Sequence, residues 1–309
     1  MAPASPAASS PAAAPDALRA LLVELSDLKR VRSAGRRGSI AERLFLQGWA
    51  ALVGGAEPEA LALDITATAL AAARLGDIDA AFLSAAGLSP DETAAVLQAG
   101  FDAVAGDLDP TLARRLRERL ASRAERPAGP VPGFAAMQAE QPRAGVTCPG
   151  RPRIVLEPPE NHAEHCLMVA VYGVVLSPFY GADPGTVFVA AMAHHLHNAL
   201  MPDAGFTGEM LLGPHLDAVI ARTAAMALDE LQPGLRATVE SARRILPDDA
   251  TAEGRAFHAA DVVDRVLQIA QHLRAASLTM DTVLGEMALV HDGPVKGFHD
   301  RVLAAMHLP

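Results

Sequence analysis

The segment 193–205, AHHLHNALMPDAG, places three histidines and an asparagine within five positions of an otherwise apolar stretch. Imidazole nitrogens bind divalent transition metals and exchange protons near neutral pH. On a continuous helix His194, His197 and Asn198 share one side, whereas His195 points about 100° away from His194. Not all of them can therefore bind one metal ion, although adjacent residues can both reach an ion where the backbone bends.

Two further segments carry residues of the same chemical kind. All eleven histidines lie between residues 162 and 307, and His162 and His165 begin the apolar stretch ENHAEHCLMVAVYGVVL. A histidine at the start of a buried helix can point into a cleft. The alternative is a capping or solvated histidine, which suits His162 better than His165.

The third segment, AFHAADVVDRVLQIA, places Asp261 in an apolar helix. Buried carboxylates are rare unless they are paired or bound to a metal. Asp264 stands next to Arg265, so we expect it to form a surface ion pair.

Together these segments predict one metal site built from three helices. His165, His194, His195 and Asp261 form a nitrogen and oxygen ligand set that suits one divalent transition metal, namely Mn, Co, Ni, Fe or Zn. The alternative is a set of unconnected core and surface histidines.

Composition predicts the scaffold that positions these residues. Half of the 309 residues are hydrophobic and 4% are aromatic, with Ala and Leu abundant, which favours an all-α fold. We expect a disordered tail over 1–15, an accessory helical domain over 16–124, a Pro-rich extended connector over 125–160 and a histidine-bearing helical domain over 161–309. Ser89, followed by Pro90 and two acids, is a helix start signal.

Charge and cysteine usage narrow the function classes. A net charge of −10 argues against a general nucleic-acid binder, although a local basic cluster can still hold a small phosphorylated substrate. Cys148 and Cys166 form no CxxC spacing, so we expect reduced thiols. We also expect no secretory leader and no membrane span, hence a cytoplasmic protein, and a homodimer is compatible with these features.

The three segments resemble motifs of the HD-domain metal-dependent phosphohydrolase superfamily, and most of all those of bacterial 5'-deoxynucleotidase-like proteins. NHAEHCLMVA is similar to the family segment NVAEHSLRVA, which implies a ligand at His165. MAHHLHNALMPD is similar to the family helix LLHDxxE…D, which implies a ligand at His194 and places His195 where the family has aspartate. AADVVDRVLQ is similar to the closing ADxL helix, with its ligand at Asp261.

The resemblance covers residues 150–275 and implies hydrolysis of a phosphomonoester, most readily a nucleotide. It implies that Asp203 orients or deprotonates the attacking water, and Asn198 stands where the family has a contributing glutamate. Arg151 and Arg153 stand in the region that contacts phosphate.

The His-His doublet departs from the family pattern, because imidazole cannot bridge two metal ions as a carboxylate does. The resemblance therefore implies a mononuclear centre here. Two alternatives remain open: a non-catalytic HD-like ligand- or metal-binding regulatory protein, and an iron oxygenase of the HD type. A weaker likeness between 39–53 and 161–175 suggests that the accessory domain is a degenerate HD-like copy.

Overall fold

The computed structural model describes residues 17–122, 127–147, 153 and 155–275. Within these residues the chain forms helices and no strand, and the one β-type contact is an isolated bridge between Pro142 and Asn161. The all-α prediction is confirmed. The expected tail over 1–15 and the part of the expected histidine-bearing domain from 276 to 309 lie outside the described residues.

The N-terminal region contains a series of helices that begin at side-chain caps. Ser39 accepts a hydrogen bond from the backbone amide of Glu42, and Ser89 forms the predicted start with a reciprocal bond to Glu92. The helices are α1 (Ala17–Ser26), the 3₁₀ turn η1 (Asp27–Lys29), α2 (Ile40–Val53), α3 (Pro58–Leu75), α4 (Ala80–Ala85), α5 (Pro90–Asp102), η2 (Ala105–Asp107) and α6 (Pro110–Leu120).

The segment expected to be an extended connector contains helix α7 (Gly133–Glu140). Pro132 precedes its first residue, and the buried ring of Phe134 packs edge-on against Trp49 of α2, with ring centroids 4.8 Å apart. The prediction of an extended connector is wrong for residues 133–140. Proline is tolerated at the start of a helix, and it does not prevent that helix from packing against the core.

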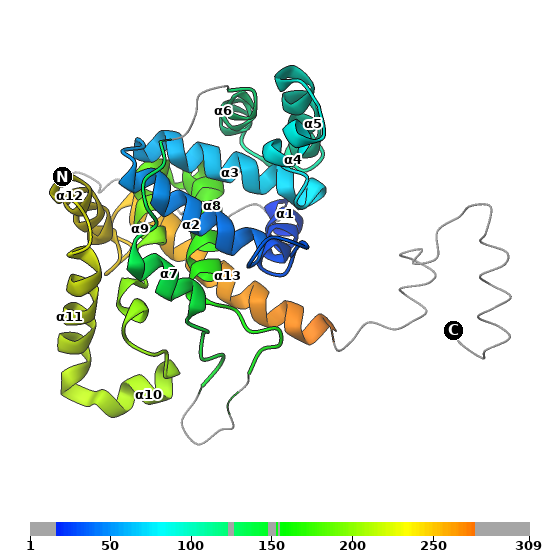
Figure 1. Cartoon of the computed structure of the whole chain (residues 1–309). Helices are drawn as coiled ribbons and strands as arrows, with labels where there is room; N and C mark the ends of the chain where they lie inside the picture. Colours follow the sequence, from blue (N-terminus) through cyan, green and yellow to red (C-terminus); the bar gives the residue numbers. More distant parts are fainter. Residues whose placement is uncertain (1–16, 123–126, 148–152, 154, 276–309) are drawn as a thin grey trace, which may run out of the picture. The chain divides into compact units, whose positions relative to one another are not determined.

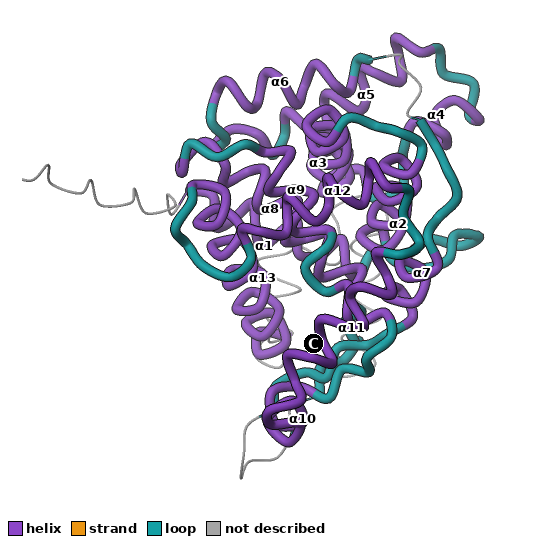
Figure 2. The backbone as a smooth tube through the Cα atoms, turned by 90° about the vertical axis from the view of Figure 1, so that its left-hand side faces the viewer, coloured by secondary structure: helices purple, strands orange, loops and turns teal. Residues whose placement is uncertain are grey.

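Helix α8 (His162–Tyr180) occupies the centre of the core, with α9 (Pro184–Met192) beside it (Figures 1 and 2). Asn161 and Glu164 form a capping box at the start of α8, and the side chains from His162 to Ser177 are all buried. Gly173 permits close packing, because a Cβ there would lie 2.5 Å from a methyl carbon of Val187 on α9.

Helices α2 and α3 pack directly against α8 and α9, so the N-terminal helices share a core with the histidine-bearing ones. Because of this shared core, the structure does not separate an accessory domain from a metal-binding domain at the expected connector, and that division stays a prediction. By length and composition α8 could cross a membrane, but 83% of its apolar window is buried inside the protein, as in an ordinary core helix.

Breaks in the backbone divide the remaining helices. Helix α9 stops at Met192, and the helix that begins at Gly205 ends before Gly213. The elements are η3 (Leu196–Ala199), α10 (Gly205–Leu212), η4 (Gly213–His215), α11 (Leu216–Leu228), α12 (Pro233–Ala242), η5 (Arg243–Ile245) and α13 (Ala252–Ala275). The described residues up to Arg265 form one compact unit; a second begins at Val266, and 266–275 is its described part.

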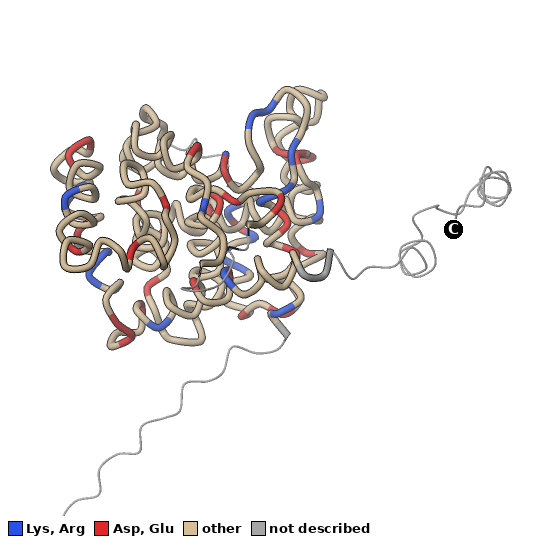
Figure 3. Tube along the Cα trace, turned by 90° about the horizontal axis from the view of Figure 1, so that it is seen from below, with Lys and Arg blue, Asp and Glu red and all other residues tan. Residues whose placement is uncertain are grey.

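Acidic and basic side chains are interspersed along the described helices, as Figure 3 shows. Several form pairs between neighbouring helices, such as Arg119 with Asp64 and Arg117 with Asp102. This mixture is typical of a solvated surface and differs from the concentrated basic face that binds nucleic acid.

Candidate metal centre

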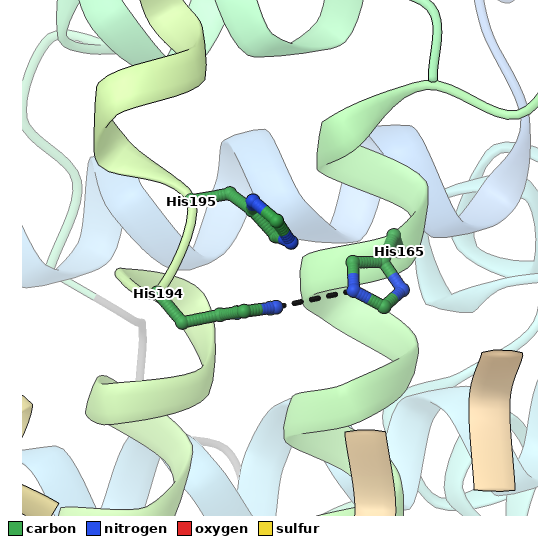
Figure 4. Close-up of side chains that lie close together, drawn as sticks. All are labelled: His165, His194 and His195. Carbon is green, nitrogen blue, oxygen red and sulfur yellow. Dashed lines mark hydrogen bonds between the residues drawn. The ribbon is translucent and has the colours of Figure 1, made fainter. Parts of the chain in front are cut away.

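The end of α9 brings adjacent histidines to the same place. The backbone leaves the helix at Ala193 (φ −109°, ψ 2°) and His195 (φ −105°, ψ 27°) before η3 begins. The rings of His194 and His195 consequently lie 4.2 Å apart, and both approach His165 on α8, at 5.0 and 5.2 Å between centroids (Figure 4). The 100° divergence of a continuous helix does not apply here, because the backbone bends between the two residues.

The nitrogen spacing in this cluster is close to that of ligands on one metal ion. The Nε2 atoms of His165 and His194 lie 3.1 Å apart, and one nitrogen from each of the three histidines lies within 4.8 Å of the others. Nitrogens bound to one ion at about 2.0–2.1 Å lie about 3.3–3.4 Å apart in tetrahedral geometry, and about 2.8–3.0 Å as octahedral neighbours. The 3.1 Å spacing between the Nε2 atoms of His165 and His194 falls between these two values.

Each of the three histidines bonds an oxygen through Nδ1. His165 donates to the Asp264 carboxylate at 2.8 Å, and His194 to the backbone carbonyl of Ala191 at 2.6 Å. His195 donates to the amide oxygen of Asn198 at 2.8 Å, an assignment that follows because the Asn198 amide nitrogen donates to the carbonyl of Met201. Nε2 of His195 is buried without a hydrogen-bond partner, whereas the Nε2 atoms of His165 and His194 lie within hydrogen-bond distance of each other.

Burial keeps the imidazoles of His194 and His195 neutral. The pKa values of His194 and His195 lie well below the ordinary value of 6.5, mainly because burial penalises the charged form and also because the neighbouring histidines would repel a second charge. Neutral imidazole is the form that binds a metal ion.

Asp261 of α13 lies at the edge of the cluster. One carboxylate oxygen is 3.3 Å from Nε2 of His165, and the other accepts a hydrogen bond from Arg265 one turn away. Burial opposes its ionisation, but the neighbouring His165 and Arg265 hold the pKa of Asp261 well below its usual range. It is therefore an ionised oxygen ligand candidate beside His165, although its carboxylate does not lie within 4.8 Å of all three imidazoles.

Asp264 does not form the expected surface pair with Arg265. It is fully buried, and its carboxylate accepts hydrogen bonds from His165 and from Nζ of Lys29, the latter at 2.8 Å. The expectation was wrong because the partner, Lys29 of η1, is 235 residues away in the chain. A carboxylate behind an imidazole fixes its tautomer and orientation.

Lys29 also joins a wider buried charge network that sequence analysis did not find. Its ammonium donates to Glu160 at 2.7 Å, and Glu160 accepts from Arg143 at 3.1 Å. Burial disfavours the ionised form of Glu160, but Lys29 and Arg143 lower its pKa to about 2. One available signal was composition, because Lys29 is one of two lysines in a chain with 26 Lys and Arg residues.

Asp203 and Asn198 lie beside the cluster and differ in their surroundings. Asp203 accepts hydrogen bonds from the backbone amides of Ala144 and Gly205, and its carboxylate is 3.4 Å from Nε2 of His162. These donors hold the pKa of Asp203 well below its usual range despite partial burial. Asn198 is buried and has both ends of its amide bonded to the protein.

Of the two expected phosphate contacts, the structure describes one. Arg151 lies outside the described residues, and Arg153 is exposed, with a hydrogen bond to the carbonyl of Ala204 at 3.3 Å. A different arginine, Arg143, acts on the cluster, since its charge contributes to lowering the pKa values of His194 and His195, and its side chain keeps 21% of its surface exposed.

Comparison of the chain with models of protein families, with curated proteins and with solved structures finds no match.

Proposed function

We propose that the chain binds one divalent transition metal at His165, His194, His195 and Asp261 and hydrolyses a phosphomonoester, with nucleotides as the first substrates to test. The observation that carries the proposal is the convergence of the three histidines, since one nitrogen of each lies within 4.8 Å of the others. Nδ1 of each ring bonds an oxygen, so Nε2 is the nitrogen that each histidine can offer to a metal ion. The likeness of the three motifs to the HD-domain phosphohydrolases supports the reaction class.

Coordination number decides which metals would support hydrolysis. A bound ion would supply Lewis acidity and lower the pKa of a coordinated water. Four protein ligands saturate a tetrahedral ion such as Zn but leave positions open on a six-coordinate ion such as Mn, Co, Ni or Fe. We therefore expect hydrolysis with the six-coordinate metals and tight but unproductive binding of Zn.

Three neighbouring residues would act on the substrate side. Asp203 is a weak proton acceptor because its pKa is low, so its expected role is to orient the water or His162 rather than to remove a proton. Arg143 supplies a partly exposed positive charge beside the cluster, which suits an anionic phosphate. Asn198 orients His195 and acts through it.

The second candidate is a non-catalytic metal-binding protein of regulatory type. The same four-ligand set favours it, because a site closed by protein ligands is typical of structural metals. This candidate predicts stoichiometric metal without turnover.

The first experiment is elemental analysis of the purified full chain, followed by assays with a panel of nucleoside monophosphates and other phosphomonoesters in the presence of Mn, Co, Ni, Fe or Zn. His194→Gln should abolish both metal retention and hydrolysis. The matched control, His215→Gln, changes an exposed histidine of η4 and should alter neither. Metal-loaded protein without hydrolysis would favour the non-catalytic candidate, and protein that retains no metal would refute both.

A second variant, His195→Asp, addresses the departure from the family doublet. Lost hydrolysis in this variant would identify His195 as a working ligand. Raised hydrolysis would identify the wild-type site as a decayed one.

A further inference from the structure

A second group of candidate ligands adjoins the three-histidine cluster and shares His165 with it. One ligand atom from each of Glu160, His165 and Asp264 lies within 4.8 Å of the others, and all three residues are buried. The two groups use opposite sides of one ring. Nε2 of His165 faces the histidines, whereas Nδ1 donates to Asp264. Adjacent ligand groups of this kind can hold two metal ions.

The second group already contains a cation of the protein. Nζ of Lys29 lies 2.7 Å from Oε1 of Glu160 and 2.8 Å from Oδ1 of Asp264. Lys29 is 3% exposed and Asp264 is fully buried, so water cannot screen these contacts. With Arg143 on the other oxygen of Glu160, two positive charges balance two carboxylates.

We propose that Lys29 takes the place of a second metal ion and, by fixing Asp264, completes the metal centre from the N-terminal region. A compact ammonium fits between two carboxylates that a planar guanidinium would force apart. The centre consequently holds one metal ion, and Lys29 is a positioning residue for His165. This inference rests on the proposed metal site, and it argues against a two-iron oxygenase.

Loss of Lys29 should weaken metal binding without touching a ligand. Without its ammonium the Asp264 carboxylate keeps one described donor, His165, and loses one of the two contacts that orient it. Substitution of groups that orient a metal ligand typically lowers metal affinity by about 10- to 100-fold. A purely structural role for Lys29 would lower thermal stability but leave the affinity of the folded protein unchanged.

The test is titration of the full chain with Co²⁺, followed by visible absorption, which reports affinity, stoichiometry and ligand geometry together. Wild type should bind one Co²⁺ per chain, and Lys29→Ala should bind it at least about 10-fold more weakly. Millimolar ethylammonium should restore the affinity of Lys29→Ala, whereas NaCl at equal ionic strength should not. Arg32→Ala is the matched control, because it removes a positive charge from the same segment through a side chain that is 54% exposed.

The outcomes separate this inference from the proposed function. Wild type that binds no metal overturns both. Wild type that binds one ion, together with unchanged affinity in Lys29→Ala, overturns the role of Lys29 alone, as does wild type that binds two ions. If Lys29→Ala does not fold, Lys29→Met fills the same volume without the charge, and its affinity is compared with wild type in the same way.

Discussion

Acidification of the metal-free protein from pH 7 to pH 5.5 tests whether the buried imidazoles stay neutral in the folded state. His194, His195 and His197 all have pKa values below the ordinary 6.5, chiefly because of burial, and the pKa of His197 falls to about 4. In the unfolded chain the same groups titrate near 6.5. The unfolded state therefore binds more protons as the pH falls, and the free energy of unfolding decreases.

The magnitude follows from the difference in proton binding. A histidine that stays neutral when folded and titrates at 6.5 when unfolded costs about 1.2 kcal/mol between pH 7 and pH 5.5. The three histidines together cost about 4 kcal/mol, a large part of the stability of a typical domain, about 5–15 kcal/mol. His162, whose pKa is also lowered by burial, adds to the loss. Ordinary carboxyl pKa values of 3.8 and 4.5 lie below this pH window, whereas burial raises the pKa of Glu164, whose proton uptake in the folded state would offset part of the loss.

The measurement is urea unfolding followed by circular dichroism, on protein treated with a chelator, at half-unit steps of pH. His197→Gln removes one contribution and should reduce the loss by about 1 kcal/mol, since His197 belongs to no proposed ligand set. A free energy of unfolding that is constant or rises between pH 7 and pH 5.5 would refute the assignment of neutral buried histidines.

Three further substitutions probe the centre and the core. Asn198→Ala removes the acceptor that orients His195, so the affinity for Co²⁺ should fall about 10-fold while the helix content stays unchanged. An affinity equal to that of wild type in a Co²⁺ titration would contradict the orienting role. Tyr172→Phe removes a buried hydrogen bond to the carbonyl of Leu22, with an expected loss of about 1 kcal/mol in urea unfolding, and an unchanged midpoint would show that the bond contributes nothing. Gly173→Val should destabilise the α8–α9 contact by more than about 1–3 kcal/mol, and a variant with native thermal stability would disprove that close packing.

Local patterns in the sequence predicted the fold class and several helix starts. The buried apolar run after His165 predicted a core helix, and Ser89 with its following proline and acids predicted the cap that the structure contains. These patterns involve residues that are close together in the chain, so they can be recognised in a single sequence.

Features that depend on distant partners were not predictable in this way. No glycine or proline marks the break after Met192, and the carbonyls of Ala193 and His195 are bonded by the side chains of Arg243 and Gln138. The burial of Asp264 likewise depends on a lysine from the opposite end of the chain. Sequence spacing therefore identified candidate ligands but not the groups that orient them.

The contact between Lys29 and Asp264 has a consequence for biosynthesis. These partners are 235 positions apart, so all of the intervening chain must be synthesised before the contact can form, and residue 264 must also leave the ribosome. Pairing across such a separation carries a closure entropy that other folding must offset, so this contact is expected late in folding. A growing chain would therefore emerge with its histidines exposed and acquire the complete centre only after nearly all of its helices are in place.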